Sequence, residues 1–342
     1  MNNIVIIPSL EPNENIIKLI EELKNLNFAN IIIVNDGSNR HYDHIFDKLK
    51  SLGCIIITHK KNIGKGESLK DGIKYASKYF DKKGYITADG DYQHLPTDIL
   101  KVASELENNQ NKILLGVRNF KNKNVPLKSR FGNKFSSIFF KLQTGIALED
   151  TQTGLRGIPK EYTKLALEAE GKRYDYEMNF LRKVALNKIE LKEVEIETIY
   201  NDQNKGSHFK TVSDAILIYK ELIHCIINSL LSATLDIALF AILVNTFLGA
   251  TALYIAIANI TARLLSGVFN FFVNSKIAFK SKEKMYKQIY RYITLFIAQL
   301  IVSSLLIAIL STIPINIVII KIFIDITIFM VNYFIEKRFI FK

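Results

Sequence analysis

The stretch YITADGDYQH at residues 85–94 joins a short apolar segment to a turn with two carboxylates. Tyr85–Ala88 has the composition of a buried strand, and Asp89 and Asp91 follow it directly. In an open α/β sheet, ligands bind beyond the carboxyl ends of the strands. Two carboxylates on an irregular strand end can both reach one hard cation, such as Mg²⁺ or Mn²⁺, which takes oxygen ligands. By itself the motif also fits a solvated acidic turn.

The chain before and around this motif alternates between short apolar runs and helical patterns. Short β-branched runs separated by helices of about 10–15 residues are typical of a parallel sheet. We therefore predict an α/β domain with a mostly parallel sheet over residues 1–210. The expected strands are Ile4–Ile7, Ile31–Val34, Cys54–Thr58 and Tyr85–Ala88, and the expected helices are Glu14–Leu26, His44–Leu52 and Ser68–Phe80.

Two further turns also lie where expected strands end. The turn Asn35-Asp36-Gly37-Ser38 offers a carboxylate that can accept hydrogen bonds from a nucleobase or ribose. The segment 62–66 (NIGKG) opens a helix, and a helix N-terminus with glycines favours phosphate. Its spacing differs from that of a P-loop. Each turn alone is ordinary, but three in this order indicate a nucleotide site.

After residue 210 the composition becomes strongly apolar. Four stretches are each long enough to cross ~30 Å of hydrocarbon as a helix: Cys225–Leu248, Ala250–Val273, Ile293–Ile313 and Ile315–Ile335. An apolar bundle in a soluble protein is the alternative, which so many nearly uncharged stretches disfavour. We predict a juxtamembrane helix or linker over residues 211–224 and an all-α membrane domain with four transmembrane helices over residues 225–342.

The distribution of basic residues predicts the orientation in the membrane. The loop between the second and third stretches carries Lys276 to Arg291, a run of basic residues, and Lys337 and Arg338 lie near the C-terminus. Cytoplasmic loops carry an excess of Lys and Arg. We therefore expect a multi-pass cell-membrane protein with the 1–210 domain and the C-terminus in the cytoplasm. The net charge of +12 divides evenly between the two parts, so we expect no nucleic-acid partner.

Together these motifs resemble family 2 glycosyltransferases of the GT-A fold, a Rossmann-like architecture. The later segments resemble the polyprenyl-phosphate branch, which includes dolichol-phosphate mannose synthase. The membrane part, with Phe269-Asn270-Phe271 and the ending Asn332 to Phe339, resembles the GtrA-like four-helix domain. The segments that carry the branch resemblance are 126–133 (PLKSRFGN), 150–156 (DTQTGLR), Tyr176-Glu177, and Tyr200 with 204–209 (NKGSHF).

The resemblance implies roles for residues on the donor side. Asp36 would hold the base, and Asp89 and Asp91 would bind ribose and metal-diphosphate, with Gln93 assisting at a Mg²⁺ or Mn²⁺ ion. The implied nucleotide-sugar residues are Pro8, Glu11, Asp36, Lys65, Asp89 and Asp91, and the implied metal residues are Asp89, Asp91 and Gln93. Two positions depart from the family pattern: Asn35 replaces an Asp, and Leu10-Glu11-Pro12 replaces Tyr-Asn-Glu.

The acceptor side follows from charge. A lipid phosphate is already a nucleophile near neutral pH, so it needs cations more than a general base. The candidates for its phosphate are Arg130, Lys134, Lys205, Ser207 and His208. Asp150 or Glu177 would position the acceptor or take a residual proton, unless both cap helices or pair with Arg156 and Arg173. The resemblance also implies that Arg130 and Arg156 neutralise donor and acceptor phosphates. The expected catalytic residues are Asp91, Asp150, Glu177, Arg130 and Arg156.

Residues 131–142 have an apolar helical face with basic residues beside it. Phe131, Phe135, Ile138, Phe139 and Leu142 fall on this face, next to Arg130, Lys134 and Lys141. The pattern fits an interfacial helix on the bilayer, and it fits a core helix with a basic outer face equally well.

The expected function is inverting transfer of one sugar to a polyprenyl phosphate for cell-envelope glycosylation. The donor would be a GDP- or UDP-linked sugar, and the enzyme would act at the cytoplasmic face, with a homo-oligomer allowed. A processive polysaccharide synthase needs a Gln-x-x-Arg-Trp signature, and the sequence has no tryptophan. A lipid-linked sugar flippase with a nucleotide-sensing domain is the other alternative, which the intact Asp89, Asp91 and Gln93 disfavour. The charges Asp236, Arg263, Lys321 and Asp325 lie within expected spans. They form either two ion pairs, Asp236 with Arg263 and Lys321 with Asp325, or a polar track for the lipid phosphate or sugar head group.

Overall fold

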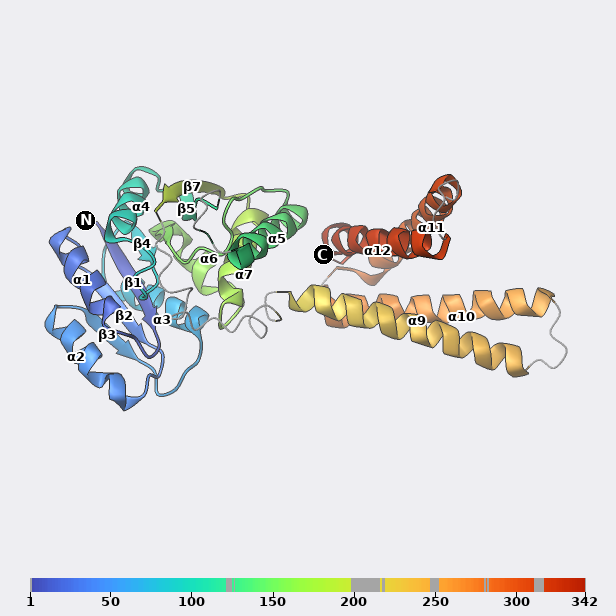
Figure 1. Cartoon of the computed structure of the whole chain (residues 1–342), viewed down its shortest axis with the longest axis horizontal. Coiled ribbons are helices and arrows are strands. Elements are labelled where there is room, and N and C mark those ends of the chain that lie inside the picture. The colour runs from blue at the N-terminus through green and yellow to red at the C-terminus, as the bar shows by residue number, and fades with distance from the viewer. Residues whose placement is uncertain are drawn as a thin grey trace. The chain divides into compact units, whose positions relative to one another are not determined.

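A single mixed sheet organises the first part of the chain. The computed structural model describes residues 2–120, 125, 127–197, 216, 219–246, 252–279, 281, 283–310 and 317–341. The chain divides into two compact units, Met1–Ile218 and Tyr219–Lys342 (Figure 1). The strands of the first unit are β1 (Asn3–Ser9), β2 (Ile31–Asn35), β3 (Ile55–Thr58), β4 (Gly84–Thr87), β5 (Lys112–Arg118), β6 (Arg156–Pro159) and β7 (Glu190–Ile196). In the order β3-β2-β1-β4-β6-β5-β7, β6 runs antiparallel to both neighbours and the other described pairs are parallel.

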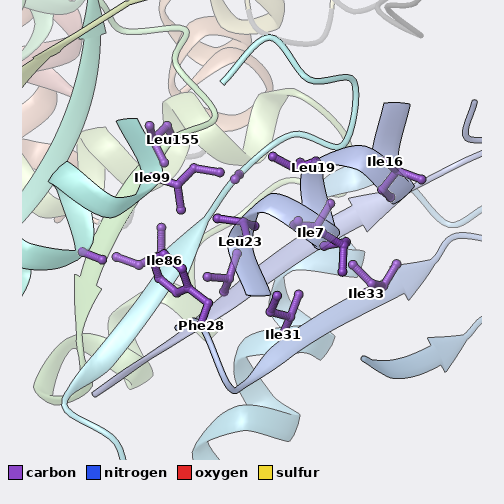
Figure 2. Close-up of a cluster of buried hydrophobic side chains, with 14 of the residues drawn as sticks. Ile7, Ile16, Leu19, Leu23, Phe28, Ile31, Ile33, Ile86, Ile99 and Leu155 are labelled. Carbon is purple, nitrogen blue, oxygen red and sulfur yellow. The ribbon is translucent and has the colours of Figure 1, made fainter. Parts of the chain in front are cut away.

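Helices cover both faces of this sheet because its central strands are apolar on both sides. Ile4 and Ile6 of β1 join one buried cluster, and Val5 and Ile7 join the other. The second cluster, with Ile7, is drawn in Figure 2. It is covered by α1 (Asn15–Asn25), α2 (Asp43–Ser51) and α4 (Pro96–Asn108). The opposite face carries α3 (Lys65–Tyr79), α5 (Leu127–Thr144), α6 (Thr163–Leu167) and α7 (Asp175–Leu186).

The predicted α/β domain with a mostly parallel sheet is confirmed. Each predicted strand overlaps one of β1 to β4, and each predicted helix overlaps α1, α2 or α3. Ser9 pairs with Asn35 in register, so the carboxyl ends of β1 and β2 lie at one edge. Since β4 runs parallel to β1, the turn after Thr87 reaches that same edge.

The second unit consists of long helices at the four predicted apolar stretches. They are α9 (Lys220–Thr246), α10 (Ala252–Val273), α11 (Met285–Leu310) and α12 (Ile317–Ile335). α9 packs along α10, and α11 contacts α12 (Figure 1). Among the described residues, one helical segment, Leu222–Leu243 of α9, is long and apolar enough to cross a membrane. The count of four spans stays a prediction.

Amide side chains join the helices of this unit at one end. Asn228 of α9 donates to the Asn274 side chain at 2.7 Å, and Asn274 donates to Glu336 at 3.0 Å. Two π-helical turns, Asn274–Ala278 and Glu336–Ile340, begin at these last two residues. Buried polar groups need such partners, so this network helps to specify how the helices pack.

The charges predicted within the spans are only partly described. Asp236 on α9 accepts a hydrogen bond from Ser266 on α10 at 3.1 Å. The side chains of Arg263, Lys321 and Asp325 lie outside the described part of the chain. The Asp236–Arg263 pairing therefore stays a prediction.

Candidate active site

The acidic turn after β4 is held in place by hydrogen bonds to its own residues. The backbone amide of Asp89 donates to Nδ1 of His94 at 3.2 Å, and the amide of Gln93 donates to Asp91 Oδ1 at 3.1 Å. Tyr92 adopts a positive φ of 64°, a conformation that is uncommon outside glycine. Burial lowers the pKa of His94 to about 4, so its ring is neutral and can accept this bond at neutral pH.

Lys65 lies between two carboxylates from different elements. Its Nζ is 2.6 Å from Asp89 Oδ1 and 3.0 Å from Glu177 Oε1, and 15% of its side chain is exposed. Burial opposes the charged ammonium, but Asp89 and Glu177 together raise the pKa of Lys65 above its ordinary value. Burial likewise opposes ionisation of Asp89, but Lys65 lowers its pKa to about 2. Lys65, Asp89 and Glu177 thus form a charged cluster that joins α3, the β4 turn and α7.

In the part of the chain that the structure describes, Asp91 forms no ion pair like the one between Asp89 and Lys65. Burial and the neighbouring charge of Asp89 raise the pKa of Asp91 to about 6. Two carboxylates this close favour a divalent ion, and Mg²⁺ is commonly held by one or two carboxylates plus water and phosphate oxygens. Among the described residues, no group of three or more His, Cys, Asp and Glu side chains could hold a metal. The carboxylates of Asp89 and Asp91 have the oxygen chemistry for Mg²⁺ or Mn²⁺ in this shared mode, and the role of Gln93 at the metal stays a prediction.

Gly154 lets the loop before β6 approach the acidic turn. A Cβ at position 154 would lie 2.4 Å from Asp89 Oδ2, closer than side-chain contacts allow. The carbonyl of Gly154 also accepts a hydrogen bond from the Thr87 side chain at 2.8 Å. The Asp-Thr-Gln-Thr-Gly segment and the acidic turn are thus packed together, although Asp89 and Gly154 lie 65 positions apart in the sequence.

Asp36 holds the loop that precedes α3. Its carboxylate accepts hydrogen bonds from the backbone amides of Ile63 and Gly64, both at 2.9 Å, and lies 3.0 Å from Nδ1 of His59. Gly64 has a φ of 107°, which favours glycine. The amides expected to attract phosphate at residues 62–66 are therefore already engaged at Ile63 and Gly64. The role of Asp36 in binding the base stays a prediction.

The other nucleotide-side residues lie at the same edge of the sheet. Pro8 pairs in register with Val34 near the end of β1. Glu11 has a φ of 46°, and its backbone amide donates to Ser38 Oγ at 2.8 Å. Asn35, which departs from the family pattern, accepts from the amide of Ser38 at 2.9 Å and so closes the turn.

Asp150 and Glu177 are both paired, but with partners that the sequence did not indicate. Asp150 is fully buried and binds Arg118 through both oxygens, with Nε–Oδ2 at 2.6 Å and Nη2–Oδ1 at 3.0 Å. Glu177 contacts Lys65 at 3.0 Å. The structure thus gives Asp150 and Glu177 the cations Arg118 and Lys65, and a pairing with Arg156 or Arg173 stays a prediction.

Arg156 is buried and donates to backbone carbonyls. Its Nε donates to the carbonyl of Thr153 at 3.0 Å, and its Nη1 donates to that of Glu177 at 2.8 Å, while Nη2 has no hydrogen-bond partner among the described residues. Only 3% of Arg156 is exposed. Its contacts position the loop and helix around Lys65, and a direct contact with phosphate stays a prediction.

The acceptor-side cations are described only in part. Arg130 is half-buried and Lys134 is exposed, and both lie on α5. Lys205, Ser207 and His208 lie outside the described residues. Of the apolar face predicted on this helix, Phe139 is buried, whereas Phe131 is 69% exposed and Phe135 is 48% exposed. The alternative of a core helix with a basic outer face is therefore wrong for most of this face.

Sequence reasoning missed Arg118 and gave His94 no role. Arg118 is the last residue of β5, so the rule that sites form beyond carboxyl ends of strands could have identified it. His94 belongs to the motif at residues 85–94, but only the folded turn shows that its ring accepts a hydrogen bond from the Asp89 amide.

Two protein families match the two units of the chain separately. The glycosyl transferase family 2 profile matches residues 4–164, and the GtrA/DPMS transmembrane domain profile matches residues 225–341. An uncharacterized protein of Methanocaldococcus jannaschii is 31% identical over 220 residues, which are 63% of this chain and 89% of that protein. UDP-N-acetylglucosamine--dolichyl-phosphate N-acetylglucosaminyltransferase of Methanococcus voltae is 32% identical over 217 residues, 58% of this chain and 86% of that protein. A solved mannosyltransferase of Pyrobaculum calidifontis, in complex with GDP-Man and Mn²⁺, aligns with a TM-score of 0.41 and 10% identity over 99% of this chain and 87% of that chain.

Proposed function

The chain belongs to glycosyl transferase family 2 and carries a GtrA/DPMS transmembrane domain, and on this basis we propose that it transfers one sugar from a GDP- or UDP-linked nucleotide-sugar to a polyprenyl phosphate. The observation that carries the proposal is the cluster of Lys65, Asp89, Asp91 and Glu177 at the carboxyl edge of the sheet. The name of the Methanococcus voltae relative supports a lipid phosphate as acceptor and a UDP-linked sugar as the first donor to test.

The donor half of the proposal places the nucleotide-sugar diphosphate beside the acidic turn. Asp89 and Asp91, with Gln93, would hold Mg²⁺ or Mn²⁺, which supplies Lewis-acid stabilisation of the departing diphosphate when bound. Lys65 lies 2.6 Å from Asp89 and so keeps that carboxylate ionised and oriented. Asp36, Pro8 and Glu11 would contact the nucleoside from the ends of β1 and β2.

The acceptor half places a lipid phosphate opposite the departing diphosphate. Arg130 and Lys134, with Lys205, Ser207 and His208, would bind the acceptor phosphate. Direct in-line attack by a phosphate oxygen forms the new bond to the anomeric carbon as the bond to the diphosphate breaks, which inverts that carbon. Asp150, held by Arg118, and Glu177, held by Lys65, would orient the reacting groups.

In this proposal, residues 225–342 form four transmembrane helices. Residues 211–224 connect them to a cytoplasmic domain over residues 1–210. α9 to α12 occupy the four apolar stretches, and the basic loop between α10 and α11 supports a cytoplasmic position for that end. The reaction would then take place on the cytoplasmic leaflet.

The test is a transfer assay with the full-length chain in nanodiscs. Nucleotide-sugars, beginning with UDP-N-acetylglucosamine, are supplied with Mg²⁺ or Mn²⁺, with and without polyprenyl phosphate. We expect diphosphate release that depends on the lipid and an equal amount of sugar in the lipid phase. Asp91→Asn should abolish both, whereas Asp81→Asn, at a highly exposed carboxylate, should abolish neither.

Two outcomes would contradict the proposal. Diphosphate release without a lipid product would show a different acceptor. Nucleotide-sugar binding without any diphosphate release, for every donor tested, would favour a flippase with a nucleotide-sensing domain.

A further inference from the structure

The ammonium of Lys65 is held unequally by its two carboxylates. Its Nζ forms a hydrogen bond with Asp89 Oδ1 at 2.6 Å, and it lies 3.0 Å from Glu177 Oε1. Among the described residues, Glu177 Oε1 has no hydrogen-bond partner, although only 6% of Glu177 is exposed. A buried acceptor without a hydrogen bond is costly. Glu177 is therefore a carboxylate that a small shift of this ammonium would satisfy.

The two oxygens of Asp89 have different surroundings. Oδ2 lies against the backbone of Gly154, where a Cβ would come within 2.4 Å of it. Lys65 occupies the side of Oδ1. A divalent ion bound to Asp89 would therefore lie beside the ammonium, at a carboxylate with little room on its other side. Two cations this close repel each other strongly where little water screens them, and only 15% of the Lys65 side chain is exposed.

One divalent ion would balance the charges of this cluster. Asp89, Asp91 and Glu177 carry three negative charges when ionised and Lys65 carries one positive charge, so the four side chains have a net charge of −2. A divalent ion brings the total to zero and allows two neutral groups, the ion with Asp89 and Asp91, and Lys65 with Glu177. Buried charges require such partners.

The surroundings on the α7 side would keep the ammonium in the site. The ring centroid of Tyr174, which precedes α7, lies 5.3 Å from Nζ of Lys65, within the range of a cation–π contact. Arg156 donates to the backbone carbonyl of Glu177 at 2.8 Å and so fixes the first turn of α7. The carboxylate that would receive the ammonium is thus already in place.

We propose that Lys65 is the counter-ion of Asp89 in the metal-free chain, and that its ammonium moves from Asp89 to Glu177 when a divalent ion binds. Lys65 is then a positioning residue, which holds Asp89 before the ion binds and neutralises Glu177 afterwards. Divalent ions should bind weakly to the nucleotide-free chain, because the contact between Lys65 and Asp89 must break first. The location of the ion at Asp89 and Asp91 rests on the proposed function.

The test measures the Kd for Mn²⁺ of the full-length chain in detergent at pH 7.5 without nucleotide, by EPR of the free ion. Lys65→Met should lower this Kd by about tenfold or more, because no like charge has to be displaced. Glu177→Gln should raise it, because the displaced ammonium loses its second partner. Lys70→Met is the matched control and should leave the Kd unchanged, since Lys70 is 16% exposed on the same helix but pairs with Glu67.

A double variant distinguishes this movement from a general effect of charge. If Glu177 matters only as the partner of the displaced ammonium, Lys65→Met/Glu177→Gln should bind Mn²⁺ as Lys65→Met does. A general effect of charge would instead make Glu177→Gln raise the Kd by the same factor in both backgrounds. That result, or an unchanged Kd in Lys65→Met, would overturn the proposal.

Thermal unfolding gives a second measurement that does not depend on activity. Saturating Mn²⁺ should raise the Tm of Lys65→Met by more than that of the wild type, because the ion binds the variant more tightly and replaces the missing positive charge. If Lys65→Met does not fold, Glu177→Gln still decides, because an unchanged or lower Kd in that variant would contradict the proposal.

Failure of this inference can be distinguished from failure of the proposed function. If Mn²⁺ binds to neither the wild type nor any variant, with or without UDP, the metal site of the proposed function is wrong, and the movement of Lys65 is refuted with it. If Mn²⁺ binds equally to the wild type and Lys65→Met, the metal site stands and only the movement of Lys65 is refuted.

Discussion

Replacing Lys65 with methionine should destabilise the first unit strongly. The substitution keeps the length of the side chain but removes an ammonium that lies 2.6 Å from Asp89 and 3.0 Å from Glu177. Breaking a buried ion pair by removing one partner costs about 3–5 kcal/mol, because the remaining charge is left uncompensated. The fall in the pKa of Asp89 from 3.8 to about 2 alone corresponds to roughly 2 kcal/mol. We therefore expect a loss of about 3 kcal/mol, or roughly 6–12 °C in Tm for a unit of this size.

The dependence on pH gives this prediction a sign that a simple packing defect would not have. In the wild type, the lowered pKa of Asp89 contributes stability above about pH 4, and that contribution is lost as the pH falls toward 2. Without Lys65, burial and mutual repulsion should raise the pKa values of the remaining carboxylates. These groups would then take up protons as the pH falls from 7.5 to 5, which relieves the cost. The difference in Tm between wild type and Lys65→Met should therefore shrink at pH 5.

The assay uses the full-length chain in detergent with EDTA and without nucleotide. The sequence has two cysteines, both buried. In a Cys225→Ala background, a thiol-reactive dye therefore reports the unfolding of the unit that contains Cys54 and Lys65. Lys70→Met is the control, because Lys70 is similarly buried on the same helix but pairs with Glu67 three residues away and otherwise donates to the neutral carbonyl of Gly171. A loss of Tm no larger than that of Lys70→Met, or a loss that is the same at pH 5 and 7.5, would refute the reasoning.

Three further predictions test the remaining groups. Asp91→Asn should cost at least ~2.7 kcal/mol of transition-state stabilisation in the transfer assay, and normal turnover would contradict the role of Asp91. The same variant should raise the Tm in EDTA at pH 7.5, because the raised pKa of Asp91 destabilises the folded state above about pH 6. Arg156→Lys should lower the Tm through loss of hydrogen bonds to backbone carbonyls. Arg130→Lys should instead reduce activity about tenfold or more with little change in Tm, because lysine replaces the guanidinium poorly at a phosphate. Equal changes in Tm for the two variants would refute a structural role for Arg156 and a phosphate-binding role for Arg130. If Asp236 and Arg263 pair, each single charge reversal should lower the Tm, and exchanging the two residues should restore it. If the exchange also restores full activity with the lipid-linked substrate, these two residues do not form a polar track.

The sequence by itself determined the order of elements through β4 and the edge of the sheet where the acidic turn lies. Short continuous apolar runs, helical patterns and turn residues are local signals, so they can be recognised without knowing any distant contact. Asp89 and Asp91 were assigned to the end of a strand from residues 85–94 alone, and β4 ends at Thr87. By contrast, β6 and its antiparallel pairing carry no such signal, because its four residues include a glycine and a proline.

The tertiary structure alone decided which charges pair and which way α5 faces. An ion pair depends on a distance that folding sets, and 45 Lys and Arg residues were available to Asp150 and Glu177. Their partners, Arg118 and Lys65, lie 32 and 112 positions away in the sequence. The periodicity of α5 likewise defined an apolar stripe but not its direction. That direction was set by polar contacts on the other side of the helix, since a buried Asn133 must find a hydrogen-bond partner and a phenylalanine on the outer face has only solvent or lipid to meet.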